Sequence, residues 1–513
     1  MIDESRPGRN QPEGSAIPPP RFGKRRIYYD NFAAHLLNAY NPNMLFPGRP
    51  YEWSDEDWRR NLGMVASFGY NVWEFWLIPR LFCREALQSD FGRAFIRQMN
   101  RAIEYAHARG LKVEMLCALA TVGSDWHTFC PQVESEWREI RFLWDTWTRE
   151  LPGLDIVGIF PGDPGACSRN GCRAETYIDR SVEIAEIVKS NLPAVEIEFH
   201  TWGSPFFGWG IIEGPKDWKG EYIPEFQSTA WTFDRHRTEM SMQHLLKRLP
   251  DFPAPTSVAI NMAFNPDGNP EGEEDARSWC REIASSHPVY SWDFSLTEGE
   301  NNIVPHYRLA RLFERRRAER DCNAFSGGIC YTMTPLLNQL SLYAAAQSFL
   351  DPNADPDRLA GNFYQALFGP AGREIVPFLP LFEVVHDWGN YHRIELSREE
   401  YHRKMKQLAA LLHGLKGREG SDIELFPSSD DYRRELLFFA ELFTAFSGTS
   451  PDFDTLGRNY WNRVYRIYDD LPEHVDPRPR QATEHLVRHF AGGSSGGRSI
   501  PENPLEGSQI PNP

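Results

Sequence analysis

The chain of 513 residues has no long apolar run, few cysteines and no excess of positive charge. Its longest apolar runs fall short of the roughly 18 residues that a membrane-spanning helix needs. Its first residues, MIDESRPGRNQPEGSAIPPPRFGKRR, include no apolar core of a signal peptide. Eight cysteines in so long a chain do not make a disulfide scaffold, and a formal charge of -16 argues against nucleic acid or an anionic membrane as the partner. We therefore expect a protein of the cytoplasm.

Aromatic residues, by contrast, are plentiful. The sequence has 16 Trp, 19 Tyr and 33 Phe, or 13% of the chain, and many of them fall in loops or at strand ends. One interpretation is a large core with bulky packing. The other is a set of flat platforms on which sugar rings stack.

Residues 25–340 alternate short apolar runs with amphipathic helical patterns, which is typical of a (β/α)8 barrel. The predicted strands are residues 26–32, 71–78, 111–119, 155–163, 195–203, 257–264, 288–296 and 326–333. The predicted helices between them include 55–69, 91–110, 176–191, 273–286 and 305–320. A further run at 227–233 is either an inserted strand or a sign that the strand count is wrong by one. An open, doubly wound sheet is the alternative fold.

The rest of the chain lacks strand patterns. Helical periodicity dominates residues 341–490 and predicts a helical C-terminal domain after the barrel. The predicted helices there are 337–350, 355–369, 373–389, 397–417, 430–448 and 458–471. Residues 1–24 and 491–513 are rich in Pro, Gly and polar residues, and we expect both segments to be disordered.

Acidic residues interrupt strands that a parallel barrel buries on both faces. Glu74, Glu114, Glu196 and Glu198 lie within predicted strands, and the period of two places Glu196, Glu198 and His200 on one face of theirs. Buried carboxylates cost several kcal/mol each unless they are paired or have a purpose. Either Arg and Lys side chains pair with them inside the barrel, or they belong to a site.

Active sites of this fold lie at the carboxyl ends of the strands. Two carboxylates across that mouth, with aromatic residues around them, are the equipment for hydrolysis of a glycosidic bond, in which one acts as general acid and the other as nucleophile or base. The candidate catalytic residues are Asp163, Asp293, Glu298 and Glu300. The candidate substrate-binding residues are Asp30, His127, His200, Trp202, Asn261, Trp292 and Tyr331. Asp30 with His127 is an alternative catalytic pair.

A family resemblance points the same way. The segment that begins YSWDFSLTEGENNIVPHYRL and continues through NADPD (353–357) to Tyr364 and FGP (368–370) resembles the later part of α-glucuronidase-like and hexosaminidase-like barrel glycoside hydrolases. The resemblance implies a (β/α)8 barrel, a helical C-terminal domain and an oligosaccharide or glycoside as substrate. Those families present Glu, or an Asp-Glu pair, at the end of the fourth strand, where this chain has Asp163 followed by Pro164.

Two other classes of protein fit the same barrel. A metal-dependent sugar isomerase or epimerase would use Glu114, Glu198, His200 and Asp293 as oxygen and nitrogen ligands. A non-catalytic carbohydrate-binding barrel would need no acids at all. The sugar, the stereochemical course and the oligomeric state stay open.

The cysteines and glycines predict no cofactor. Cys167 and Cys172 have the spacing of a small disulfide loop or of half a zinc site, but no second close pair follows them, so we expect buried free thiols and no metal. No glycine pattern has the spacing of a phosphate-binding loop.

Overall fold

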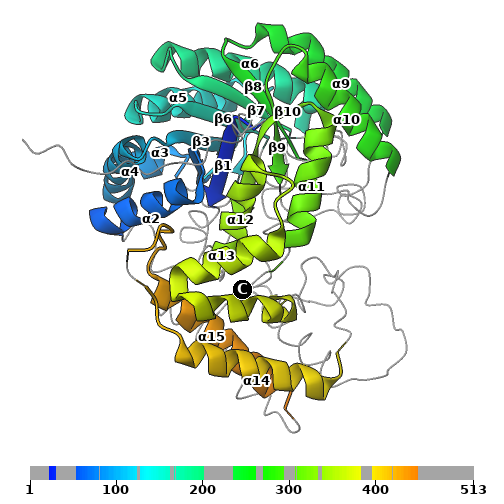
Figure 1. The fold of residues 1–513 in the computed structure, drawn as a ribbon. Helices are drawn as coiled ribbons and strands as arrows, with labels where there is room; N and C mark the ends of the chain where they lie inside the picture. The colour runs from blue at the N-terminus through cyan, green and yellow to red at the C-terminus, as the bar shows by residue number, and fades with distance from the viewer. Residues whose placement is uncertain are drawn as a thin grey trace, which may run out of the picture.

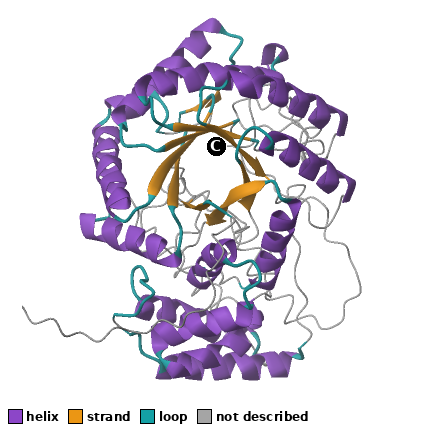
Figure 2. Cartoon of the chain, turned by 45° about the horizontal axis from the view of Figure 1, so that its top comes forward, coloured by secondary structure: helices purple, strands orange, loops and turns teal. Residues whose placement is uncertain are grey.

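Eight parallel strands close into a barrel in the order β1-β10-β9-β8-β7-β6-β3-β2 (Figure 2). The structure is a computed structural model, and it describes residues 22–29, 53–79, 81–123, 127–161, 167, 169–201, 235–261, 270–293, 307, 309–332, 338–382, 396–418 and 420–448. The strands of the barrel are β1 (Lys24–Tyr29), β2 (Val72–Leu77), β3 (Lys112–Ala118), β6 (Ile156–Phe160), β7 (Glu196–His200), β8 (Thr256–Asn261), β9 (Val289–Asp293) and β10 (Phe325–Thr332).

A helix follows every strand, so that a ring of helices surrounds the barrel (Figures 1 and 2). The helices of this part are α2 (Asp55–Phe68), α3 (Arg84–Gln88), α4 (Asp90–Ala108), α5 (Glu134–Glu150), α6 (Ala174–Asn191), α9 (Arg235–Arg248), α10 (Pro270–Ala284), α11 (Leu309–Cys322) and α12 (Gln339–Leu350). Two short 3-10 helices, η2 (Arg169–Gly171) and η4 (Leu249–Asp251), and a hairpin of β4 (Thr121–Val122) with β5 (His127–Thr128) lie in the connections.

The (β/α)8 prediction is confirmed, and the alternative of an open sheet is wrong, because β1 pairs with both β10 and β2 and closes the ring. Each of the eight predicted strands overlaps an observed one. Helices α5 and α9 were not among the predicted helices, and the run at 227–233 lies outside the described residues. Strand β1 begins at Lys24, two residues before the predicted start, and Phe22 is already buried.

Local sequence explains where the helices begin. Ser54 and Asp57 form a capping box at the start of α2, in which each side chain bonds the other residue's backbone N–H. Gly69 ends the same helix with φ of 101°, a left-handed conformation that favours glycine. Asp355 caps α13 (Pro356–Phe368), and Pro356 is its first residue, where a missing N–H has no cost.

Helix α12 completes the ring, since it contacts β10, α11 and α2. Beyond it, α13, η5 (Pro370–Phe382), α14 (Arg398–Gly414) and α15 (Ser429–Phe446) form a helical layer on one side of the barrel (Figure 1). An α-helix over 373–389 was predicted, but the described part is the 3-10 helix η5, because Pro377 and Pro380 within it lack the N–H that α-helical bonding requires. The predicted helix at 458–471 lies outside the described residues, and the domain boundary at residue 340 stays a prediction.

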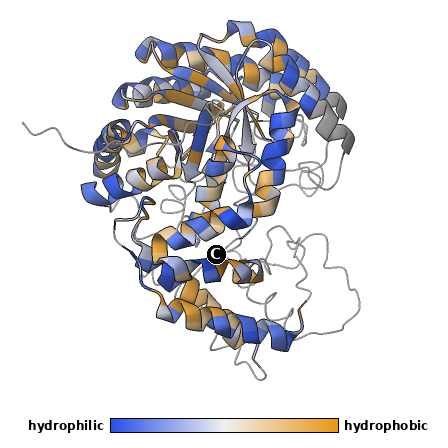
Figure 3. Ribbon diagram, viewed as in Figure 1, coloured by the Kyte–Doolittle hydropathy of each residue, from blue (hydrophilic) through white to orange (hydrophobic). Residues whose placement is uncertain are grey.

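One apolar core runs through the barrel and the helical layer. The Tyr364 and Tyr432 hydroxyls are 3.0 Å apart between α13 and α15, and the Gln339 side chain of α12 donates to the Phe426 carbonyl oxygen at 2.8 Å. Hydrophilic and apolar residues alternate along the helices (Figure 3), as expected of helices with one face on a core. Among the described residues, no helix has the length and apolarity to cross a bilayer.

Candidate functional site at the carboxyl end of the barrel

Three neighbouring strands end on polar residues that were predicted from the sequence to belong to the site. His200, Asn261 and Asp293 are the last residues of β7, β8 and β9, and these strands are adjacent and parallel in the barrel. The backbones of all three therefore lie at the carboxyl edge, where barrel enzymes keep their active sites. Strand β6, next to β7, ends at Phe160, three positions before Asp163.

The structure describes only part of the predicted site. Asp30, Asp163, Trp202, Glu298 and Glu300 lie outside the described residues. Asn261, Asp293 and Tyr331 are placed in their strands, but their side chains are not described. His127, His200 and Trp292 are described fully.

Aromatic side chains form a layer inside this mouth that sequence reasoning missed except for Trp292. Tyr28, Trp76, Phe160 and Trp292 occupy the last or next-to-last positions of β1, β2, β6 and β9. Tyr28 packs edge-on against Trp292 with ring centroids 6.0 Å apart, and Trp76 packs edge-on against Phe160 at 5.6 Å. An aromatic residue two positions after an inward acid or arginine, as in RIY and EFW, was the available clue.

Beneath this layer the barrel interior holds a buried cluster of charged side chains, which we call the Arg26 cluster. It consists of Arg26, Glu74, Glu114, Glu198 and His200, all with no exposed surface. The Arg26 guanidinium hydrogen-bonds the carboxylates of both Glu114 and Glu198. Its carbon atom Cζ lies 4.6 Å from the centroid of the Tyr290 ring, a cation–π contact. Arg26 therefore supplies inside the barrel the positive charge that its acids require.

His200 lies at the upper edge of the Arg26 cluster, directly below the mouth. Its Nε2 atom is 3.2 Å from Glu198 Oε1 and 3.5 Å from Glu114 Oε1, and its ring meets the Trp292 ring edge-on at 5.0 Å. Burial alone would lower the pKa of His200, but the two carboxylates outweigh it and raise that pKa to about 9. The imidazole is thus held as a cation, which suits a hydrogen-bond donor better than a general base.

Glu74 differs from the other acids of the Arg26 cluster in that its carboxyl group is not hydrogen-bonded to Arg26. Neither of its carboxyl oxygens has a hydrogen-bond partner among the described residues, and its nearest cation, Arg26 Nη1, is 4.0 Å away. Burial and the neighbouring Glu114 carboxylate raise the pKa of Glu74 well above its usual range. By contrast, Arg26 and His200 overcome the effect of burial and hold the pKa of Glu198 below its usual range. The surroundings therefore favour opposite forms of the two acids, the protonated form of Glu74 and the ionised form of Glu198.

The strand β6 leaves room for these groups by having no side chain at Gly158. A Cβ there would lie 2.8 Å from Glu114 Oε1 and 2.9 Å from His200 Nε2, closer than real contacts allow. The glycine in IVGIF is thus required by the acids and the histidine that fill the barrel.

A second ionic layer closes the amino end of the barrel. Lys24 pairs with Glu196, and the Ser257 hydroxyl bridges Glu196 and Glu198 at 2.7 and 3.0 Å. Pairing inside the barrel, one of the two interpretations of the strand acids, is therefore realised for Glu114, Glu196 and Glu198.

His127 lies in the β4–β5 hairpin, between β3 and α5. It is opposite Val122, is half-buried, and packs edge-on against Phe129 with centroids 5.2 Å apart. Its suggested partner Asp30 lies outside the described residues, so that pair stays a prediction.

Two of the residues proposed for a metal-dependent isomerase, Glu114 and His200, lie close together with Glu74, which was not among them. Ligand atoms of Glu74, Glu114 and His200 all lie within 4.8 Å of one another, a geometry that can hold a metal ion. However, the Arg26 guanidinium contacts the carboxylates of Glu114 and Glu198. Because this cation already compensates their charge, the Arg26 cluster is better suited to hold the barrel together than to bind Mg²⁺ or Mn²⁺.

No known family model matches the chain, and no curated protein matches it. Among solved structures, the chain is similar to a mutant of the O-GlcNAc hydrolase of Thermobaculum terrenum, at 13% sequence identity and a TM-score of 0.49, over 91% of this chain and 95% of that one. It is also similar to two proteins named CpGH84D and CpGH84B, at 11% identity and TM-scores of 0.48, over 92% of this chain and 75% and 77% of theirs. At such low identities and TM-scores, the likeness transfers neither a substrate nor a catalytic residue.

Proposed function

We propose that this protein is a glycoside hydrolase whose active site is the carboxyl mouth of the barrel. The observation that carries the proposal is the layered mouth. Aromatic rings of Tyr28, Trp76, Phe160 and Trp292 lie above the buried Arg26 cluster, next to strands that end on His200, Asn261 and Asp293. These rings are at most 4% exposed and form the apolar floor of the mouth, and polar groups at the strand ends orient the hydroxyls of a sugar above it.

Two carboxylates at this mouth carry the chemistry in our proposal. Asp163 follows β6, Asp293 ends β9, and Glu298 and Glu300 follow β9. Because β7 and β8 separate β6 from β9 in the closed ring, acids on the two sides flank a sugar bound between them. One protonates the leaving oxygen, and the other attacks the anomeric carbon or activates water.

The remaining candidates bind the substrate in this proposal. They are Asp30, His127, His200, Trp202, Asn261, Trp292 and Tyr331. His200, held as a cation by its two carboxylates, is suited to donate a hydrogen bond at the base of the mouth. We propose no cofactor for the hydrolysis, and we propose the cytoplasm as the location of the protein.

The decisive experiment is a screen of aryl glycosides on the purified full chain. N-acetylglucosaminides come first, after the name of the Thermobaculum neighbour, and uronides second, after the family resemblance of the sequence. For the substrate that is cleaved, we expect Asp163→Asn and at least one of Asp293→Asn, Glu298→Gln and Glu300→Gln to lower kcat by about 10²–10⁴-fold or more. The general-acid variant loses least on substrates with activated leaving groups, since these need no protonation.

A matched control is Asp251→Asn, an exposed acid in η4 at the amino end of β8, which should keep the wild-type kcat. Near-normal rates for all four acid variants would contradict the proposed roles. Activity that disappears on dialysis against EDTA and returns with Mg²⁺ or Mn²⁺ would instead favour the isomerase. Saturable sugar binding without turnover would favour the non-catalytic barrel.

A further inference from the structure

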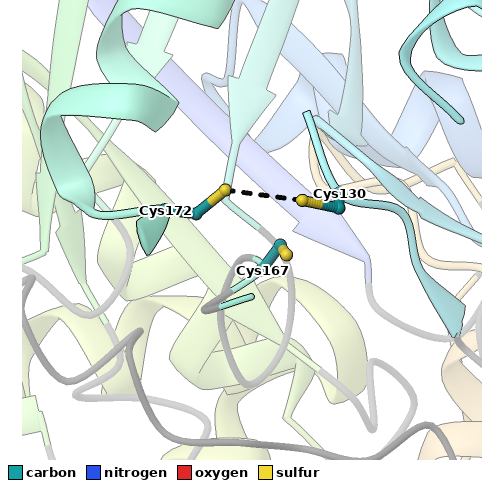
Figure 4. A group of neighbouring side chains, drawn as sticks. All are labelled: Cys130, Cys167 and Cys172. Carbon is teal, nitrogen blue, oxygen red and sulfur yellow. Dashed lines mark hydrogen bonds between the residues drawn. The ribbon is translucent and has the colours of Figure 1, made fainter. Parts of the chain in front are cut away.

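Three of the eight cysteines form a small cluster of their own, which we call the cysteine cluster. Cys130, Cys167 and Cys172 are buried together, apart from the main apolar core, and among the described residues the apolar side chain of Val133 packs against them. The other five belong to that core or pack against it: Cys83, Cys117, Cys280, Cys322 and Cys330. Figure 4 shows the side chains of Cys130 and Cys172 pointing toward each other, with Cys167 beside them.

The spacing of the sulfur atoms matches metal coordination. All three Sγ atoms lie within 4.8 Å of one another, and those of Cys130 and Cys172 are 3.6 Å apart. A tetrahedral zinc ion with Zn–S bonds of about 2.3 Å holds two sulfur ligands about 3.8 Å apart. A disulfide needs a separation of about 2.05 Å and would join only two of the three sulfurs.

The chain is shaped to bring these residues together. Cys130 follows the β4–β5 hairpin, and Cys172 lies just before α6. Between Cys167 and Cys172, Asn170 and Gly171 have positive φ values of 54° and 74°, which turn the backbone back on itself. The side-chain amide of Asn170 donates a hydrogen bond to Cys130 Sγ at 3.4 Å. Donors of this kind, bonded to the ligand atoms, support metal–thiolate sites.

A divalent metal ion binds such sulfurs as thiolates, because coordination deprotonates thiols and releases their protons to solvent.

We propose that Cys130, Cys167 and Cys172 together bind one zinc ion, with the fourth position of the tetrahedron left for a further ligand. Thiolate sulfur favours zinc over the hard cations Mg²⁺ and Ca²⁺. The ion ties the connection after β3 to the connection after β6, on which Asp163 stands four residues before Cys167. This site is independent of the proposed hydrolase activity, and sequence spacing alone shows only two of its three ligands.

The test begins with the full chain, purified in the presence of a thiol reductant and without chelator. We expect elemental analysis to find about one zinc per chain. Cobalt added after the zinc is removed should give thiolate-to-cobalt charge-transfer bands and the intense visible bands of a tetrahedral ion. Each of Cys130→Ser, Cys167→Ser and Cys172→Ser should lose the metal, whereas the control Cys83→Ser, half-buried and outside the cysteine cluster, should keep it.

The cobalt spectrum of the wild-type chain stands even if a variant fails to fold, which circular dichroism will show. The proposal is overturned if the reduced wild-type chain neither contains zinc nor takes up cobalt. It is equally overturned if mass spectrometry finds a disulfide within the cysteine cluster of the native chain, or if folded variants retain the metal.

Discussion

The barrel interior and the connection that precedes α6 each gather metal-type ligands in a buried place, but they differ in what compensates them. Glu74, Glu114 and His200 in the first, and the cysteine cluster in the second, each bring their ligand atoms within 4.8 Å. In the Arg26 cluster the chain supplies its own cation, because the guanidinium bonds two of the carboxylates. In the cysteine cluster the partners of the Cys130 sulfur include two neutral groups, the side-chain amide of Asn170 and the thiol of Cys172.

The difference teaches how to interpret a buried group of ligand-type side chains. A group that includes an arginine is already compensated and serves to hold strands in register around the barrel axis. A group of neutral thiols carries no charge that needs a counter-ion. Its sulfur atoms become negatively charged only when a metal ion binds and displaces their protons. If removing Arg26 costs no stability, the two clusters do not differ in the way described. If the ionisation of Glu74, Glu198 and His200 depends on their neighbours as described, the difference is supported.

The largest effect is expected from Arg26→Met. This change leaves Glu114 and Glu198 without their guanidinium, and breaking a buried ion pair in this way costs about 3–5 kcal/mol. We expect urea unfolding to show a loss of that size or, at the extreme, no folded protein.

The control for this change is Arg93→Met, which breaks an exposed pair with Asp90 of 2.7 Å and should cost less than about 1 kcal/mol. An equally small loss for Arg26→Met would mean that another cation compensates the acids. That cation would be His200 or, as the isomerase hypothesis requires, a bound metal ion.

The fold was largely predictable, because it depends on patterns local in sequence. Alternating apolar runs such as VWEFWL and helical periods between them located all eight strands and gave the barrel. The period of two placed Glu198 and His200 on one face of their strand, and both are buried in the barrel interior. Where local patterns misled, as in η5, the prolines inside an apolar, helix-like stretch were the cause.

The partners in the interior were not predictable from one sequence. Arg26 and Glu198 are 172 positions apart and meet only because β1 and β7 lie across a closed barrel. Cys130 likewise stands 37 positions before Cys167, and the helix α5 and the strand β6 separate them. Contacts of this kind depend on the three-dimensional arrangement of the strands, which periodicity does not encode.

The second effect is a pH dependence that comes from His200. Its pKa in the folded chain is raised to about 9, above the ordinary 6.5, by Glu114 and Glu198. The native state therefore holds this proton more tightly than the unfolded chain does. The stabilisation is complete below pH 6.5 and is lost as the pH rises through about 9, with a size on the order of 3 kcal/mol.

The measurement is the free energy of unfolding between pH 6 and about 10 for the wild type and for His200→Gln. The difference between the two profiles removes the contributions of Arg26, Glu74 and the other groups that both chains share. We expect the wild type to lose stability across this window and the variant to lose much less. Parallel profiles would show that His200 is neutral in the folded chain.

The smallest effect is expected from Glu74→Gln, and a small effect would show that Glu74 is protonated in the folded chain. Burial and the Glu114 carboxylate raise the pKa of Glu74 well above its usual range. At or below about pH 4, where the unfolded chain also holds this proton, the change replaces one neutral side chain by another of similar shape. At that pH we expect the unfolding free energy to change by no more than about 1 kcal/mol, the scale of a single hydrogen bond. Glu198→Gln, which removes an ionised partner of Arg26, should cost several times more.

Because the native state keeps the Glu74 proton that the unfolded chain releases, wild-type stability should also fall as the pH rises above the ordinary range of Glu, and Glu74→Gln should lack that fall. A large loss for Glu74→Gln at pH 7 would show that Glu74 is ionised, and the charge of the Arg26 cluster would then exceed what Arg26 and His200 compensate.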